Sequence, residues 1–218
     1  MNDPLTPDEI EANPLSIAKT FQMASGAQVT VRPLLSSDSA ALGGYFLGLS
    51  EETRRRFGPH PLDQATANNL CATINVAEAL RLVAIVPGPA GDAIIAYFIL
   101  LLDVTEYELA RYAHCGIALH SQTDCTVAPS VADRYQNSGL GSLCFQHLIE
   151  LARRLGRQRV LLLGGTQASN HRAIHFYAKH GFRTIGSFEE PEGVFNQDML
   201  LELQAGGEQA SISASNGQ

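Results

Sequence analysis

The clearest chemical signal in the sequence is a glycine-containing segment, residues 136–141 (QNSGLG), which lies between a predicted strand and a predicted helix. Glycine lets the backbone bend tightly, so that successive N–H groups can point at one ligand from the helix N-terminus. Those groups and the positive end of the helix dipole suit a phosphate or pyrophosphate. The segment therefore predicts a site for a nucleotide-like cofactor.

Several kinds of site compete for this segment. A P-loop requires a lysine after its second glycine, whereas Ser142 follows Gly141 here. A dinucleotide site requires a small residue at position 144 and an acid about twenty positions later. Position 144 is a cysteine, and no acid stands near position 160. The pyrophosphate arm of coenzyme A is the third candidate ligand. The alternative is that the segment is a tight turn that binds nothing.

Two segments resemble the GNAT superfamily of N-acyltransferases, in the same order along the chain. Residues 131–142 (VADRYQNSGLGS) resemble the family's Gln/Arg-x-x-Gly-x-Gly/Ala loop and the strand before it. Residues 170–182 (NHRAIHFYAKHGF) resemble its Asn-x-x-Ala-x-x-Phe-Tyr-x-x-x-Gly-Phe helix. The resemblance implies an α/β fold, a mixed sheet with a splayed central parallel strand pair, and acetyl-CoA as the acyl donor.

The resemblance also implies which residues hold acetyl-CoA. The end of the strand would follow the pantetheine arm, the loop N–H groups would hold the pyrophosphate, and the later helix would line the other side. The predicted cofactor-binding residues are Val131, Ala132, Asp133, Gln136, Asn137, Ser138, Gly139, Leu140, Gly141, Ser142, Asn170, Ala173, Phe176 and Tyr177.

The implied reaction is direct attack of a neutral amine on the acetyl carbonyl, which needs a base for the ammonium proton and a donor for the departing thiolate. Tyr177 is the predicted catalytic donor, since a phenol has an unperturbed pKa near 10. The alternative is that Tyr177 only packs in a helix interface.

The base is harder to assign, because the strand before the loop carries Cys125 and Val127 where family members place a glutamate or histidine. Cys125 is expected to be a buried thiol rather than a nucleophile. A water chain is one substitute, and four nearby side chains are others. They are Asp124, Glu106, Glu108 and His114.

The elements that must position these residues follow from hydrophobic periodicity and turn signals. Expected strands cover residues 28–34, 82–86, 93–102, 125–132, 159–164, 182–188 and 198–203. Expected helices cover residues 40–47, capped by Ser36 or Ser37, then 51–57, 142–155 and 171–180. The strand, helix and strand from residue 125 predict a parallel crossover. Residues 103–122 are interpreted as an insertion or lid.

The chain is long enough for one domain with tails. Residues 1–27 are interpreted as an amphipathic helical flank with a capping box at Thr6 and Glu9, residues 28–203 as the acetyltransferase domain, and residues 204–218 as a flexible tail.

Composition and charge indicate which classes of partner the protein lacks. A net charge of −7 and a pI near 5.4 argue against a nucleic-acid partner. The absence of a signal-peptide pattern and of a long apolar run predicts a cytoplasmic protein without a membrane partner. The cysteine and histidine spacings predict no metal site.

The leading hypothesis is an acetyl-CoA-dependent N-acetyltransferase that acts on a primary amine of a small molecule, a peptide N-terminus or a lysine. Its acceptor would be chosen by residues 50–60, 103–122 and 189–197. One alternative is a catalytically degenerate acyl-CoA sensor, and another is a nucleotide-binding α/β domain with a different ligand. Both a monomer and a homodimer remain open.

Overall fold

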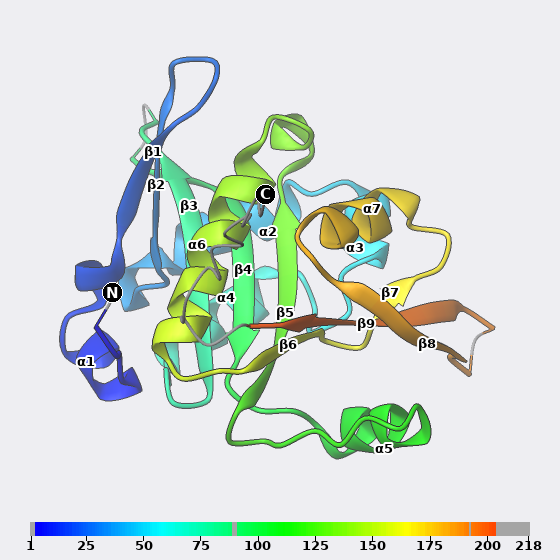
Figure 1. Cartoon of the computed structure of the whole chain (residues 1–218). Coiled ribbons are helices and arrows are strands. Elements are labelled where there is room, and N and C mark those ends of the chain that lie inside the picture. Colours follow the sequence, from blue (N-terminus) through cyan, green and yellow to red (C-terminus); the bar gives the residue numbers. More distant parts are fainter. Residues whose placement is uncertain (1–2, 89–90, 192, 204–218) are drawn as a thin grey trace, which may run out of the picture.

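The computed structural model describes residues 3–88, 91–191 and 193–203, so the predicted tail at 204–218 lies outside the described residues. Figure 1 shows a twisted sheet with helix α6 (Leu140–Arg154) crossing one face and helices α2 (Ser39–Leu47) and α4 (Gln64–Ala72) behind the other. The predicted mixed α/β sheet is confirmed.

The sheet has nine strands in the order β1-β2-β3-β4-β5-β6-β9-β7, with β8 paired to β9. Their bounds are β1 (Lys19–Gln22), β2 (Gln28–Pro33), β3 (Ala79–Val86), β4 (Ala93–Leu101), β5 (Asp124–Val131), β6 (Arg159–Leu162), β7 (Thr166–Gln167), β8 (Arg183–Glu189) and β9 (Phe195–Glu202). The remaining helices are α1 (Pro7–Ala12), α3 (Glu51–Arg55), α5 (Glu106–His114) and α7 (His171–Lys179), with 3-10 turns at Pro14–Ile17, Ser36–Asp38 and Asp133–Tyr135.

Alternation along the strands divides the core between the two faces of the sheet. In β3, Leu82 and Ala84 pack in the cluster that contains the buried face of α6. Their neighbours Val83 and Ile85 pack with α2 and α4. The central strands are buried on both sides, which accounts for the nearly unbroken apolar runs in their sequences.

The parallel pair β5 and β6 separates halfway along β5. The register ends at Val127 opposite Leu162, and the Leu163 N–H still donates to the Val127 carbonyl at 3.0 Å. The chain then turns away, because the Gly165 N–H donates to the Leu162 carbonyl and both Gly164 and Gly165 have positive φ. The last residues of β5 therefore pair with β4 on one side only.

The amino-terminal flank differs from the prediction of a helix throughout. Helix α1 begins at the predicted capping box of Thr6 and Glu9 but ends at Ala12. Strand β1 then pairs with β2, so the flank extends the sheet, and Ile10 and Ile17 are buried in its core.

Two further predictions were wrong or incomplete. Neither Ser36 nor Ser37 caps a helix, because both lie inside a 3-10 turn whose N-cap position is Leu35. Helix α4 was not predicted, since its nine residues carry a weak apolar pattern. Its buried side chains Ala67, Leu70 and Cys71 close the core behind β3 and β4.

Residues 103–122 contain helix α5, which is docked on the sheet. Its N-terminus is a capping box between Thr105 and Glu108. Arg111 pairs with Asp198 of β9 at 3.1 and 2.8 Å, and the Tyr112 hydroxyl donates to the Met199 carbonyl at 2.9 Å. The insertion is therefore fixed against β9 by contacts 87 residues apart in sequence.

We predict that Gly165→Ala destabilises the fold by about 2–4 kcal/mol, because it combines a left-handed backbone with steric overlap. A Cβ atom there would lie 2.8 Å from the Gln197 carbonyl oxygen and 2.9 Å from the Phe188 ring, at a φ of +72°. Denaturant unfolding measures the loss. Gly26→Ala is the matched control, since Gly26 has a φ of +85° and open space around it. Equal losses in the two variants would show that overlap at Gly165 is unimportant.

Candidate functional site

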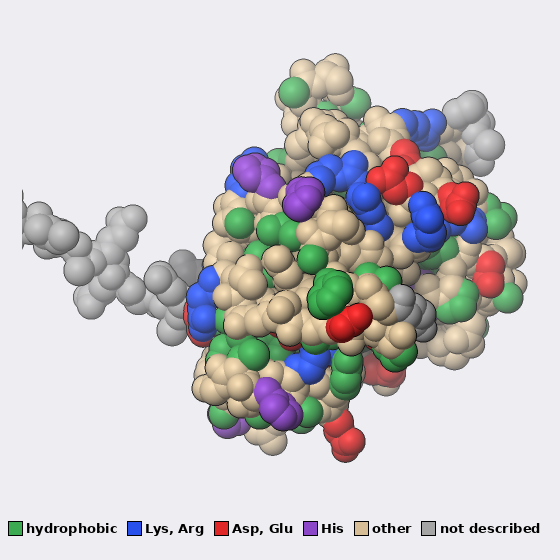
Figure 2. Space-filling view, turned by 90° about the vertical axis from the view of Figure 1, so that its right-hand side faces the viewer, with side chains coloured by type: hydrophobic (Ala, Val, Ile, Leu, Met, Phe, Trp, Pro, Cys, Tyr) green, Lys and Arg blue, Asp and Glu red, His purple; other side chains and the backbone are tan. Residues whose placement is uncertain are grey.

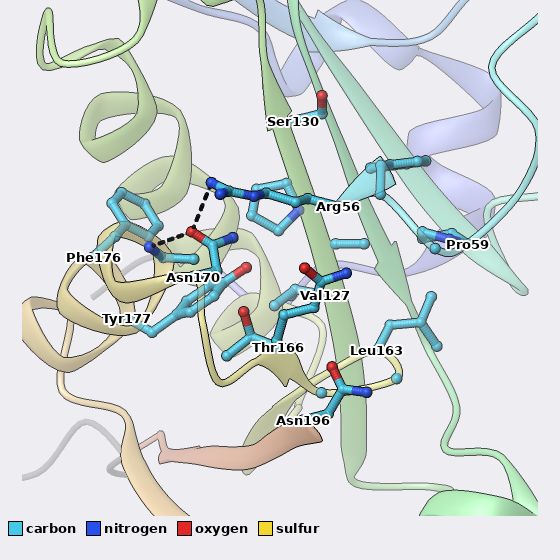
Figure 3. A pocket seen from close by; sticks show the side chains of 18 of the residues that line it. Arg56, Pro59, Val127, Ser130, Leu163, Thr166, Asn170, Phe176, Tyr177 and Asn196 are labelled. Atoms are coloured by element: carbon cyan, nitrogen blue, oxygen red, sulfur yellow. Dashed lines mark hydrogen bonds between the residues drawn. The ribbon is translucent and has the colours of Figure 1, made fainter. Parts of the chain in front are cut away.

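A cleft of about 870 Å³ opens where β5 and β6 separate. Strand β5 forms its floor, α7 and the N-terminus of α6 form one wall, and the end of α3 with the β8–β9 turn forms the other. Figure 3 shows side chains of β5, of α7 and of the segment after α3 around it. All three segments predicted to choose an acceptor contribute to its lining. They contribute Arg55–Pro59, then Thr105, Tyr107 and Glu108, then Glu190, Val194 and Asn196.

The structure brings most of the predicted cofactor residues to this one cleft. Those that line it are Val131, Gln136, Asn137, Gly141, Asn170, Ala173, Phe176 and Tyr177. The others lie in the same loop or at the helix start without lining the cleft. They are Ala132, Asp133, Ser138, Gly139, Leu140 and Ser142.

The glycine segment forms a tight loop that leads into α6. Asn137 and Gly139 both adopt positive φ, of 60° and 87°. Gly139 is the N-cap of α6 and supplies no side-chain cap. Among the described residues no acceptor takes the backbone N–H groups of Asn137, Ser138, Gly139, Gly141 or Ser142. These N–H groups at the positive end of a 15-residue helix are free to bind an anion.

The edge of β5 that faces away from β4 also carries unpaired backbone. The Ala132 N–H donates to the Ile95 carbonyl of β4, so by alternation Val131 and Pro129 turn their backbone groups to the open side. Proline has no N–H to leave unpaired there. The Val131 carbonyl accepts a hydrogen bond from Gln136 Nε2 at 3.0 Å. The Pro129 carbonyl and the Val131 N–H remain available.

Asp133 is engaged by helix α3. Its carboxylate accepts hydrogen bonds from the Ser50 N–H, the Ser50 hydroxyl and the Thr53 hydroxyl at 2.9, 2.6 and 2.7 Å. The Asp133 side chain therefore holds α3 against the loop.

Tyr177 lies in an aromatic cluster at the base of the cleft. Its ring packs against Phe145, Phe176 and Phe182 at centroid distances of 6.2, 5.5 and 5.4 Å. Burial raises the pKa of Tyr177, so the phenol stays protonated at neutral pH. The hydroxyl has no hydrogen-bond partner among the described residues, and Figure 3 shows it pointing into the cleft. Packing and proton donation are thus compatible roles for this residue.

Two contacts cross the cleft. Arg56 Nη1 donates to Asn170 Oδ1 at 3.3 Å, drawn as a dashed line in Figure 3, while Asn170 caps α7 through the Ala173 N–H. Arg172 Nη1 donates to Gln136 Oε1 at 2.6 Å. Arg55 at the end of α3 and Arg56 directly after it are exposed, and both line the cleft.

Positive charge gathers around this end of the molecule despite the net charge of −7. Figure 2 shows Lys, Arg and His side chains over the upper part of the face that carries α3 and α7. Helix α7 exposes His171, Arg172, His175 and Lys179. A local field of this kind favours phosphate groups near the loop.

Only one of the four carboxylates and imidazoles considered as a base lies in the cleft. Asp124 is fully buried elsewhere and pairs with Arg159 at 2.9 and 2.6 Å. Glu106 and His114 are exposed on α5 and do not line the cleft. Glu108 lines it and is buried.

Several residues of the cleft were not found from the sequence. Gly164 and Gly165 carried a signal, since paired glycines after an apolar run indicate a turn. Pro129 carried another, because proline within a strand indicates an unpaired edge. Thr166 and Gln167 gave none, since they reach the cleft through the pairing of β7 with β9.

Among the described residues, no group of three or more His, Cys, Asp or Glu side chains is arranged to hold a metal ion. Within the same ranges, no helix combines the length and apolar character that a membrane span requires.

Comparison with solved structures gives the same fold. The GNAT domain of S. lividans PAT is 20% identical with a TM-score of 0.67, covering 87% of this chain and 99% of that one. The protein yncA from Salmonella typhimurium, solved with its cofactor acetyl-CoA, is 17% identical with a TM-score of 0.58, covering 84% and 98%. The ribosomal-protein-S18-alanine N-acetyltransferase from Escherichia coli is 20% identical with a TM-score of 0.52, covering 83% and 97%.

No curated protein matches this sequence. The model of the acetyltransferase (GNAT) family matches residues 92–182, a range that contains β5, the glycine loop, α6 and α7. The family model therefore covers the residues that form the floor and one wall of the cleft, and the described residues share the fold of the solved GNAT domain.

Proposed function

We propose that this protein transfers an acetyl group from acetyl-CoA to a primary amine by direct attack. The observation that carries the proposal is one continuous cleft that joins unpaired loop N–H groups, an unpaired strand edge and the Tyr177 hydroxyl. We assign the activity to residues 28–203, with residues 1–27 as a flank and 204–218 as a tail.

The residues present fit acetyl-CoA at both ends. The unpaired loop N–H groups, those of Asn137, Ser138, Gly139, Gly141 and Ser142, would hold the pyrophosphate, and Arg172 would neutralise phosphate charge. The Pro129 carbonyl and the Val131 N–H match the acceptor and donor needs of an amide-bearing arm. Phe176 and Ala173 of α7 offer apolar contact from the other side. Ala132 and Asp133 would shape the arm's path rather than bond to it, because their polar groups are engaged.

The chemistry follows from the same residues. Bound acetyl-CoA supplies the thioester. The neutral amine nitrogen forms a bond to the acetyl carbon, the carbon–sulfur bond breaks, and the Tyr177 hydroxyl gives its proton to the thiolate. The extra proton on the amide nitrogen then restores the Tyr177 hydroxyl. Burial raises the pKa of Tyr177, which keeps the phenol protonated across the neutral range. The acceptor amine would enter between α3, α5 and the β8–β9 turn, where the exposed apolar side chains Tyr107, Val194 and Phe195 favour amines that carry an apolar group.

The first experiment is calorimetric titration with acetyl-CoA, with ATP and NAD as controls, followed by thiol detection with a panel of amino acids, short peptides and arylalkylamines. Selective binding with amine-dependent thiol release supports the proposal. Selective binding without release from any amine supports an acyl-CoA sensor. Tighter binding of ATP or NAD would overturn the cofactor assignment.

We predict that Gly139→Val weakens acetyl-CoA binding at least about tenfold, which is about 1.4 kcal/mol. A β-branched residue does not tolerate a φ of +87°, so the loop would rebuild and its N–H groups would no longer converge. Calorimetry of the folded variant measures the loss. Gly26→Val carries a similar backbone strain in the β1–β2 turn, at a φ of +85°, and should bind normally. Unchanged affinity in Gly139→Val would remove the loop from the binding site.

We also predict that Tyr177→Phe lowers kcat by about 10²-fold or more, the range of a lost proton donor. The acetyl-CoA affinity and the thermal midpoint should change little, because the hydroxyl bonds to no described residue and the ring stays packed. Steady-state kinetics, calorimetry and thermal unfolding are the measurements. An unchanged kcat would assign Tyr177 to packing alone.

A further inference from the structure

Glu108 is a buried carboxylate that lines the cleft on the acceptor side. It is 1% exposed and is the third residue of α5, in the insertion between β4 and β5. A buried carboxylate is costly unless hydrogen bonds or a cation offset its desolvation. The hydrogen-bond donors and cations around Glu108 therefore indicate which kind of ligand this carboxylate can bind.

The hydrogen bonds leave part of this carboxylate unused. Oε2 accepts from the Thr105 N–H and hydroxyl, both at 3.0 Å, and Oε1 accepts from the Gly164 N–H at 3.1 Å. A carboxylate offers about four lone-pair sites, so one remains. Among the described residues no cation forms an ion pair with Glu108, although the charge of its neighbour Arg111, which pairs with Asp198, also acts on it.

The position of the carboxylate is also specific. Gly164 follows Leu163, whose N–H makes the last hydrogen bond between the two parallel strands, to Val127. Glu108 thus accepts a hydrogen bond from the residue directly after the point where β5 and β6 separate, and it lines the cleft there. Its fixed partners, and the Arg111–Asp198 and Tyr112–Met199 contacts, hold it there before any ligand binds.

We propose that Glu108 receives the acceptor amine, an inference that rests on the proposed acetyltransferase function. Its free lone pair binds the incoming ammonium group and takes one proton, which leaves a neutral amine and a carboxylic acid. The amine nitrogen then bonds to the acetyl carbon, the carbon–sulfur bond breaks, and Tyr177 gives its proton to the thiolate. The extra proton on the amide nitrogen restores the Tyr177 hydroxyl, and the Glu108 carboxylic acid releases its proton to solvent. An insertion thereby supplies the proton acceptor that β5 lacks at Cys125 and Val127.

Other charged groups lie near this position. Arg111 pairs with Asp198 and its charge also acts on Glu108, while its Nη1 has no hydrogen-bond partner among the described residues. The Tyr112 hydroxyl donates to the Met199 carbonyl. Glu190, on the β8–β9 turn, is the other described carboxylate of the cleft lining, and it is more exposed than Glu108.

The test compares Glu108→Gln with Glu106→Gln, which makes the same charge change on an exposed position of the same helix. Glutamine also serves the third position of a capping box, so the variant should fold. The fastest amine from the panel is used, and kcat/KM is measured from pH 6 to pH 10 with acetyl-CoA affinity and thermal midpoint alongside.

We expect kcat/KM of Glu108→Gln to fall about 10²-fold or more at pH 7 and to recover as the amine deprotonates in solution, with acetyl-CoA affinity unchanged. Glu106→Gln should match the wild type. A loss that is the same at every pH, or that appears equally in Glu106→Gln, overturns the proposal. The proposal is also overturned if Glu108→Gln keeps the wild-type pH profile and Glu190→Gln loses it.

A second variant tests the proposal if Glu108→Gln does not fold. Glu108→Asp keeps a carboxylate at a favourable helix position and should retain the wild-type pH profile with a lower rate. A profile that shifts to the amine's own titration would contradict the proposal. If the wild type releases no thiol with any amine, the proposed function is overturned rather than the role of Glu108. The two failures are distinguishable because acetyl-CoA binding to Glu108→Gln is measured independently.

Discussion

The loss of pairing between β5 and β6 after Val127 is the constraint on which the site depends. Continued pairing would fill the edge of β5 with β6 and leave no room between them. The turn at Leu162–Gly165, with two glycines in left-handed conformations, carries β6 away. Pro129 leaves no orphaned N–H at the opened edge. The cleft is therefore built into the backbone and needs no movement of side chains to exist.

The two ends of the cleft obtain their polarity from different sources. At the loop end, the polar groups are backbone N–H groups at the start of α6, so the identity of most loop side chains matters little there. At the acceptor end, the polar groups are side chains from α3, α5 and the β8–β9 turn. A family can thus keep its cofactor while its acceptor changes, because only the second set depends on loop sequence.

Contacts between distant segments join the two ends. Asp133 ties α3 to the glycine loop, and Arg56 ties α3 to the cap of α7. Glu108 links the inserted helix to the turn that opens the sheet. Each contact bridges more than fifty residues in sequence. The acceptor side is consequently held by the same structure that would bind the cofactor.

The sequence by itself determined most of the elements and the residues of the glycine loop and α7 that line one side of the cleft. Local signals are sufficient there: the apolar runs of the central strands, the glycines before α6, and the Asn170 cap with its helix are each readable from neighbouring residues. Only the tertiary structure decided the acceptor side. The weak pattern of α4, the pairing of β1 with β2, and the bond from Glu108 to Gly164 depend on packing between segments far apart in the chain, which periodicity does not encode.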